Sequence, residues 1–170
     1  MRSAMRVIVT VVLCSVWSLG FAATNSENKA FLTTAADRNM TEAHLGQMAQ
    51  NQASQQAVRD FGQTLSQDHS KAYSELLQLA DKDHEQIPRA IDIRKDHDIQ
   101  RLMHAKGASF DREFLQDEIR DHEKLLAEYK REAAHAQNDE VKNYLNEQIA
   151  VVERHLKMAK DLAKEPARHS

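Results

Sequence analysis

Residues that interrupt helices are scarce in this chain of 170 residues, which contains only four glycines and two prolines. Outside the first 22 residues it also lacks the clusters of β-branched residues that favour strands. Ala, Leu, Gln, Glu, Lys and Arg, which favour helices, dominate instead. The composition therefore argues against a turn-rich β fold and predicts long helices.

The first 22 residues have the layout of a secretory signal peptide. Arg2 and Arg6 form a positive segment, and residues 7–19 form an apolar stretch that is short for a membrane span. Small residues three and one positions before Ala23 complete a cleavage site. We expect export to the periplasm or cell envelope and cleavage after Ala22, with an uncleaved anchor as the alternative. After cleavage no second apolar segment could span a membrane stably.

Cysteine is nearly absent. Cys14 is the one cysteine of the chain, and Leu13 before it does not suit a lipid-attachment site. Cleavage after Ala22 would remove Cys14, so the remaining chain could form no disulfide although it would enter an oxidising compartment. Its stability must then come from packing.

No run of like charges occurs. The formal net charge is −3, and it becomes −5 when Arg2 and Arg6 are lost with the leader. Alternating signs are typical of a solvated surface, so no nucleic-acid partner is expected. The chain has no Gly-x-Ser-x-Gly, no Ser-x-x-Lys in an activating context and no Gly-rich phosphate loop, which leaves nucleophilic catalysis without support.

Four segments carry apolar residues at helical spacing. They are residues 27–52, 55–82, 109–135 and 139–164. Ser54 and Ser109 are candidate N-caps of the second and third segments, and either Asn138 or Asp139 caps the fourth. Gly107 is a candidate stop before the third segment.

The expected architecture is all-α, a ferritin-like antiparallel four-helix bundle of two helical hairpins joined by a long crossover at 83–106. The crossover contains Pro88 and a short helical stretch at 98–105. The predicted divisions are a signal peptide (1–22), a flexible N-terminus (23–28), the bundle (29–164) and a flexible tail (165–170).

The two hairpins resemble each other at a constant offset of 83 residues. Phe31-Leu32 matches Phe114-Leu115, and the segment at 58–61 matches the segment at 141–144 in residue type. Two matches at one offset suggest a duplicated hairpin, which would give the bundle a pseudo-twofold axis.

Several short motifs resemble, in order and spacing, the bacterial envelope family called domain of unknown function 4142. They are Phe31-Leu32 through Gly46, Val58 through Asp68-His69, Phe110-Asp111-Arg112, Asp121-His122-Glu123-Lys124 and Arg154-His155-Leu156. The resemblance covers about residues 29–163. It implies a ferritin-like bundle outside the cytoplasm and no established activity.

A ferritin-like di-metal site requires Glu residues and two Glu-x-x-His units facing inward. The chain has one such unit, Glu132 to His135, at the end of a predicted helix. A weaker constellation remains, with one His or Glu on or beside the apolar stripe of each helix. These candidate metal ligands are Glu42, His69, His122 and His155, with Asp68, Asp121, Glu123 and Glu153 as additional ligands or second-shell acceptors. Neutral imidazoles with a carboxylate would suit iron, zinc or copper.

Two functional readings follow. Buried His and Glu can satisfy one another and fix helix register without a metal, which would fit a non-enzymatic envelope or stress-related accessory protein with a protein partner or a homo-oligomeric state. The alternative is a ferritin-like metal-binding or redox protein that uses the His/Glu site.

Overall fold

The computed structural model describes residues 18–94 and 96–165, with side chains from Asn28 onward. This part contains five α-helices and no β-strand. They are α1 (Ser18–Gln52), α2 (Gln56–Lys82), α3 (His97–Leu102), α4 (Gly107–His135) and α5 (Asp139–Leu162). The predicted all-α class is confirmed. None of the helices in the described part is both long enough and apolar enough to cross a membrane.

The helix limits differ from the predicted ones mainly at the start of the chain. Helix α1 begins at Ser18 instead of near Glu27, and it therefore includes residues 23–28, for which the sequence predicts a flexible segment. Residues 1–17 of the predicted leader and residues 166–170 of the predicted tail lie outside the described residues.

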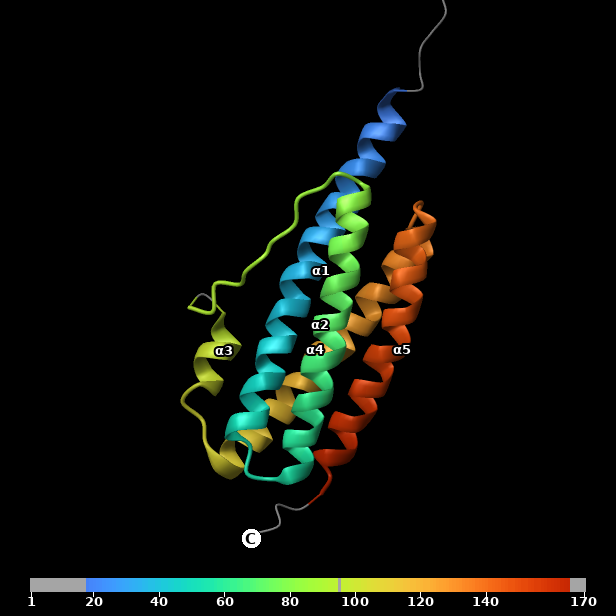
Figure 1. Ribbon diagram of the computed structural model, residues 1–170. Coiled ribbons are helices and arrows are strands. Elements are labelled where there is room, and N and C mark those ends of the chain that lie inside the picture. Colours follow the sequence, from blue (N-terminus) through green and yellow to red (C-terminus); the bar gives the residue numbers. More distant parts are fainter. Residues whose placement is uncertain (1–17, 95, 166–170) are drawn as a thin grey trace, which may run out of the picture.

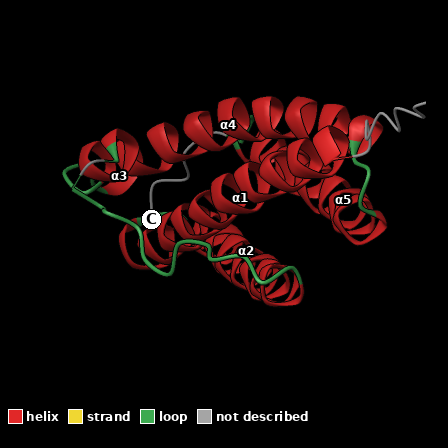
Figure 2. Ribbon diagram, turned by 90° about the horizontal axis from the view of Figure 1, so that it is seen from above, coloured by secondary structure: helices red, strands yellow, loops and turns green. Residues whose placement is uncertain are grey.

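The four long helices are arranged as two hairpins. Helix α1 packs along α2, and α4 packs along α5. The segment after α2 returns along the side of the molecule to α3 before α4 begins, so α2 and α4 run in the same direction (Figure 1). Seen from above, α3 lies at the left of the long helices, and the segment between α2 and α3 crosses the view over α2 (Figure 2). Between the hairpins, α2 contacts α5 and α1 contacts α4.

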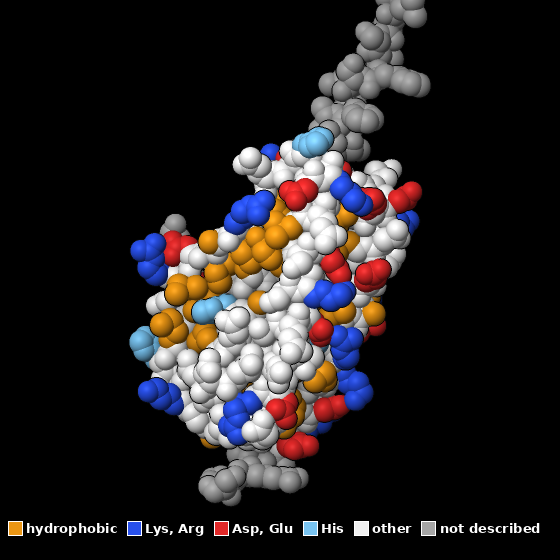
Figure 3. All heavy atoms as spheres, in the orientation of Figure 1, with side chains coloured by type: hydrophobic (Ala, Val, Ile, Leu, Met, Phe, Trp, Pro, Cys, Tyr) orange, Lys and Arg blue, Asp and Glu red, His pale blue; other side chains and the backbone are white. Residues whose placement is uncertain are grey.

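The surface carries both signs of charge. On the face shown in Figure 3, acidic and basic side chains are interspersed, and apolar side chains gather in a band on part of that face. Some opposite charges pair between helices, such as Lys130 with Glu153 at 2.7 Å and Lys82 with Glu140 at 2.7 Å. Such exposed pairs contribute little stability each, so the fold depends on the interior.

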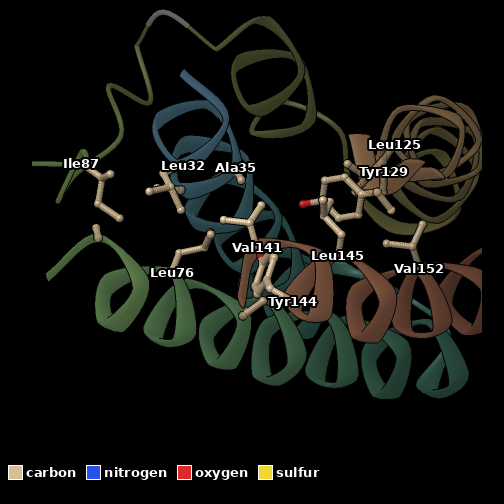
Figure 4. Close-up of a cluster of buried hydrophobic side chains, with 14 residues drawn as sticks. Leu32, Ala35, Leu76, Ile87, Leu125, Tyr129, Val141, Tyr144, Leu145 and Val152 are labelled. Atoms are coloured by element: carbon tan, nitrogen blue, oxygen red, sulfur yellow. The ribbon is translucent and has the colours of Figure 1, made fainter. Parts of the chain in front are cut away.

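The interior contains two apolar clusters. One gathers Leu32, Leu76, Tyr129 and Leu145 with their neighbours (Figure 4), and the other is built around the aromatic side chains Phe61, Phe110 and Phe114. On each long helix the buried residues of the two clusters follow one another along one stripe, as the helical periodicity predicts.

The residues of the proposed repeat occupy opposite ends of this interior. Phe31 packs against Tyr144 with ring centroids 6.2 Å apart in the first cluster, and Phe114 packs against Phe61 with centroids 6.0 Å apart in the second. The offset of 83 residues relates each member of one pair to a member of the other. This arrangement supports the duplication, which stays a prediction.

The turn between α1 and α2 is held from another helix. Ser54 does not cap α2; its backbone N–H and hydroxyl both donate to the carboxylate of Asp111 on α4, at 2.8 and 2.5 Å. The backbone N–H of Gln55, the N-cap residue of α2, donates to the same carboxylate at 3.0 Å. Asp111 is almost fully buried, and it therefore fastens the first hairpin to the second.

The other predicted caps have mixed outcomes. Asn138 caps α5 as predicted, because its side chain accepts from the backbone N–H groups of Glu140 and Val141. Helix α4 begins at Gly107, whose φ of 60° is in the left-handed region. Ser109 thus lies inside the helix, and its hydroxyl donates to the carbonyl of Lys106 at 2.8 Å. The prediction of Ser109 as a cap was wrong.

The backbones of α1 and α2 come close together where Gly46 faces Gly62. A Cβ on Gly62 would lie 2.6 Å from the Cβ of Ala49 and 2.7 Å from the carbonyl oxygen of Gly46. Because one of these obstacles is backbone, the clash could be relieved only by moving the helices apart.

Substitution of Gly62 by Ala is therefore expected to destabilise the protein, by about 1–3 kcal/mol, although Ala favours helices more than Gly does. The exposed neighbour Gln63 serves as the control, since Gln63→Ala should change stability by less than about 0.5 kcal/mol. Urea unfolding followed by circular dichroism measures both. A Gly62→Ala protein as stable as the wild type would show that the close approach does not constrain the hairpin.

Candidate metal centre

A layer of polar side chains separates the two apolar clusters. Each long helix contributes to it: Glu42 from α1, His69 from α2, His122 from α4 and His155 from α5. Their side chains are between 0% and 5% exposed. The sequence predicted these four residues at the inner faces of four helices, and the structure buries all four.

The three histidines come together. Their ring centroids are 5.2 Å apart for His69 and His155, 5.4 Å for His122 and His155, and 5.7 Å for His69 and His122. Each ring offers one nitrogen atom, and the three nitrogen atoms lie within 4.8 Å of one another. The shortest separation, from His122 Nε2 to His155 Nδ1, is 3.3 Å.

Asn39 determines which nitrogen of His69 is protonated. The Nδ2 group of Asn39 donates to the carbonyl oxygen of Ala35 at 2.8 Å, so its Oδ1 must be the atom that faces His69 Nδ1 at 2.9 Å. An amide oxygen only accepts, and His69 Nδ1 therefore carries the hydrogen. The lone pair of His69 Nε2 is consequently free, and this atom has no hydrogen-bond partner.

Asp68 orients His155 in the same way. The Nε2 group of His155 lies 2.8 Å from Asp68 Oδ2, which also accepts from Arg154 at 2.7 Å. Burial alone would raise the pKa of Asp68, but the hydrogen bonds from His155 and Arg154 lower it below its usual range. Asp68 is thus an ionised acceptor, His155 Nε2 is the donor, and the lone pair of His155 Nδ1 faces His122.

The three rings remain neutral at physiological pH. Burial lowers the pKa of His69 well below 6.5, and the neighbouring histidines add to this effect. Burial likewise lowers the pKa of His122 to about 3. The pKa of His155 is lowered by burial and partly restored by Asp68. Neutral imidazoles are the form that binds transition metals.

Glu42 belongs to a second group and not to the three histidines. Its ligand atom lies within 4.8 Å of one atom each of Glu118 and His122. Glu42 and Glu118 lie close enough for each carboxyl group to influence the pKa of the other, and Glu118 Oε2 is 3.3 Å from His122 Nδ1. The two groups therefore meet at the imidazole of His122.

Glu118 is the residue that the sequence reasoning missed. It lies four residues before His122 on α4 and is 2% exposed. The apolar residues Ile119 and Leu126, at helical spacing, predict an inner face of this helix that lies one position too far along the chain. In the structure the buried stripe lies one position earlier, at Glu118 and Leu125. A search for carboxylates four residues from His122 would have found it.

Of the four carboxylates predicted as additional ligands or as hydrogen-bond acceptors for the ligands, Asp68 is the one that hydrogen-bonds a histidine of the cluster. Asp121 is half-buried beside Arg120 and Lys124, and its negative charge helps raise the pKa of Glu42 and Glu118. Glu123 and Glu153 are about half exposed and pair with Lys160 and Lys130, respectively. Glu123 and Glu153 each follow a buried residue, His122 and Val152, by one position. A step of one residue turns a side chain by about 100° around the helix, and both carboxylates therefore face surface lysines. The Glu132 to His135 unit also lies at the surface end of α4, with His135 exposed.

Four buried side-chain atoms in the described part have no hydrogen-bond partner, and all belong to this layer. They are Glu42 Oε2, His69 Nε2, Glu118 Oε2 and His122 Nδ1. Leaving a buried polar atom unsatisfied costs about 1–3 kcal/mol. These four atoms therefore mark the layer as a place where a further partner would stabilise the protein.

Comparison with known proteins identifies one family. The family model described as Domain of unknown function (DUF4142) matches residues 19–162. No curated protein and no solved structure was found to match the chain.

The buried carboxyl pair predicts a pH dependence of stability in the metal-free protein. Burial raises the pKa of Glu42 from 4.5 to about 7, so the folded state holds this proton more tightly than the unfolded state. This proton's contribution to the free energy of unfolding is complete below pH 4.5 and is lost as the pH rises through about 7. Gln does not ionise, so the Glu42→Gln variant does not lose stability in this way. Between pH 5 and 8 it should be more stable than the wild type, by on the order of 1–3 kcal/mol.

The measurement is urea unfolding at pH 5, 6, 7 and 8 with a chelator present. Glu123→Gln, an exposed carboxylate on α4, should follow the wild-type curve. Parallel curves for wild type and Glu42→Gln would contradict the assignment of a buried protonated carboxyl group.

Proposed function

The chain belongs to the family of the domain of unknown function DUF4142, a membership that names no activity, and we propose that it is a metal-binding protein. In this proposal His69, His122 and His155 hold one divalent first-row transition-metal ion between the four long helices. The observation that carries the proposal is the convergence of three buried, neutral imidazoles, two of which have a lone pair directed inward by partners on their other nitrogen.

The spacing of the nitrogen atoms suits one ion. Two ligands at 2.0–2.1 Å from a tetrahedral ion are about 3.3 Å apart, which is the separation between His122 Nε2 and His155 Nδ1. The third nitrogen, on His69, lies within 4.8 Å of both others, and a small rotation of its ring would complete the set. Asn39 and Asp68 supply the outer hydrogen bonds that usually orient histidine ligands.

A purely structural network explains the layer less well. Such a network would satisfy its own members, because the stability of a whole domain is only about 5–15 kcal/mol and each buried unsatisfied atom costs about 1–3 kcal/mol. Four atoms of this layer are unsatisfied, among them the inward nitrogen of His69. Coordination of an ion would satisfy that nitrogen directly.

The ligand set indicates the class of ion. Three imidazoles favour zinc, copper or iron and do not suit magnesium or calcium, which prefer oxygen ligands. The near-complete burial of all three histidines favours a role in holding the ion over rapid exchange with solvent.

We also infer that the helices form a ferritin-like antiparallel four-helix bundle that acts in the bacterial envelope. Two hairpins, a long crossover and contacts across both hairpin pairs support the bundle. The positive segment and apolar stretch within residues 1–22 support export. Cleavage after Ala22 would leave nearly all of α1 in place.

Metal binding is tested on the full chain expressed without a histidine tag, stripped with a chelator and titrated with Zn²⁺ in competition with a coloured indicator. The wild type should bind Zn²⁺ tightly. Asp68→Asn keeps all three ligands but weakens the orientation of His155, and its affinity should fall about 10–100-fold. His69→Ala should lose this site, while His104→Ala, an exposed histidine, should bind as the wild type does.

The matched control for Asp68→Asn is Glu153→Gln, because Glu153 pairs with a surface lysine. Its affinity should equal that of the wild type. Circular dichroism checks that every variant is folded. Unchanged Zn²⁺ binding in folded His69→Ala and Asp68→Asn would rule out the three-histidine site.

Export makes a separate prediction. Protein recovered from the periplasmic fraction of a bacterial host should begin at Ala23 when its N-terminus is determined by mass spectrometry. Recovery of the chain in the cytoplasm with residues 1–22 attached would contradict export and would leave the metal proposal unaffected.

A further inference from the structure

The second group of the polar layer has unsatisfied atoms of its own. Glu42 Oε2, Glu118 Oε2 and His122 Nδ1 are buried without a hydrogen-bond partner, and the side chains that carry them are 95% or more buried. Glu42, Glu118 and His122 each offer one ligand atom, and those atoms lie within 4.8 Å of one another. These three side chains come from α1 and α4, the two helices of different hairpins that contact each other here.

The position of His122 distinguishes it from the other two histidines. His69 Nδ1 is hydrogen-bonded to Asn39, and His155 Nε2 is hydrogen-bonded to Asp68. The second nitrogen of His122 lies 3.3 Å from Glu118 Oε2, yet neither atom is satisfied by the other. Glu118 is therefore not placed as a simple hydrogen-bond acceptor for this ring.

We propose that Glu42, Glu118 and His122 Nδ1 hold a second divalent transition-metal ion, and that the imidazole of His122 bridges the two ions. This inference rests on the proposed function, because His122 Nε2 is a ligand of the first ion. Binding of both ions requires the ring of His122 to lose its remaining N–H proton, and the carboxyl groups of Glu42 and Glu118 to lose any proton that they hold. These protons go to solvent, while both ring nitrogens and a carboxylate oxygen of each glutamate form bonds to metal. With metal–nitrogen bonds of 2.0–2.1 Å, the ions would be about 6 Å apart.

Charge favours this assignment. Two buried carboxyl groups facing each other are costly to ionise without a compensating cation. The charge of Arg38 lowers the pKa of Glu42, but burial outweighs this effect. Arg38 itself pairs with Glu128 at 3.1 Å. A divalent ion would offset both carboxylates and the bridging ring. The mixed oxygen and nitrogen ligands suit zinc, iron or manganese.

Stoichiometry separates the two sites, because they share only His122. The metal-free full chain is equilibrated with Zn²⁺ at pH 7.5, passed through a desalting column and analysed for zinc and protein. The wild type should retain two equivalents, Glu42→Gln one, His69→Ala one and His122→Ala none. Glu123→Gln, a surface carboxylate next to His122 in the chain, should retain two.

Loading with Cu²⁺ tests the bridge. Two copper ions joined through one imidazole ring couple magnetically, so the electron paramagnetic resonance signal of the wild type should integrate to less than half of the bound copper. The single copper ion of folded Glu42→Gln should give its full signal. Two bound ions that each give a full signal would overturn the bridge.

The outcomes distinguish this inference from the proposed function. If the wild type and Glu42→Gln each retain one equivalent of zinc and His69→Ala retains none, the second ion is ruled out. The three-histidine site is then supported. Retention of two equivalents of zinc by His69→Ala, or of no zinc by the wild type, would rule out the three-histidine site. The bridged pair of ions would be ruled out with it. Circular dichroism again identifies any variant that fails to fold, in which case Glu118→Gln replaces Glu42→Gln.

Discussion

The layer of ionisable side chains between the two apolar clusters is the constraint on which the arrangement of the long helices depends. Three neutral imidazoles and two carboxyl groups are almost completely buried there, and the cost of burying them must be offset by hydrogen-bond or charge partners. Asn39 on α1 holds His69 on α2, and Asp68 on α2 holds His155 on α5. These bonds connect helices of both hairpins and set their register, whereas apolar contacts alone would tolerate sliding.

Much of the fold could be predicted from the sequence because it depends on local patterns. Helical spacing and scarce glycine and proline located four long helices, and Asn138 was identified as a cap from its position alone. The role of Asp111 could not be predicted, since it accepts hydrogen bonds from residues more than fifty positions away in the chain. The start of α1 at Ser18 was also not predicted, because the residues around position 23 have no clear apolar periodicity.

The site was predicted in part. His69, His122 and His155 were recognised because each lies on or beside an apolar stripe. Glu118 was not predicted, because the predicted buried stripe of α4 was wrong by one position and placed Glu118 on the outer face. The same uncertainty placed Glu123 and Glu153 near the site, although both pair with lysines at the surface. Helical periodicity identifies the buried face to within about one residue, and a ligand set requires a finer definition than that.

The polar layer also breaks the proposed symmetry of the two hairpins. At the offset of 83 residues the apolar pairs match, but His155 corresponds to Ala72 and His122 corresponds to Asn39. The ends of the interior therefore keep equivalent packing, while its middle differs between the halves. Packing alone does not require that difference, whereas the proposed metal site in the middle would require it.

X-ray absorption spectroscopy of the zinc-loaded full chain tests the central claim most directly, because it reports the atoms bound to the metal. The account predicts a first shell rich in nitrogen at 2.0–2.1 Å, with the outer-ring scattering that several imidazoles produce. A shell of oxygen ligands without imidazole scattering would contradict it.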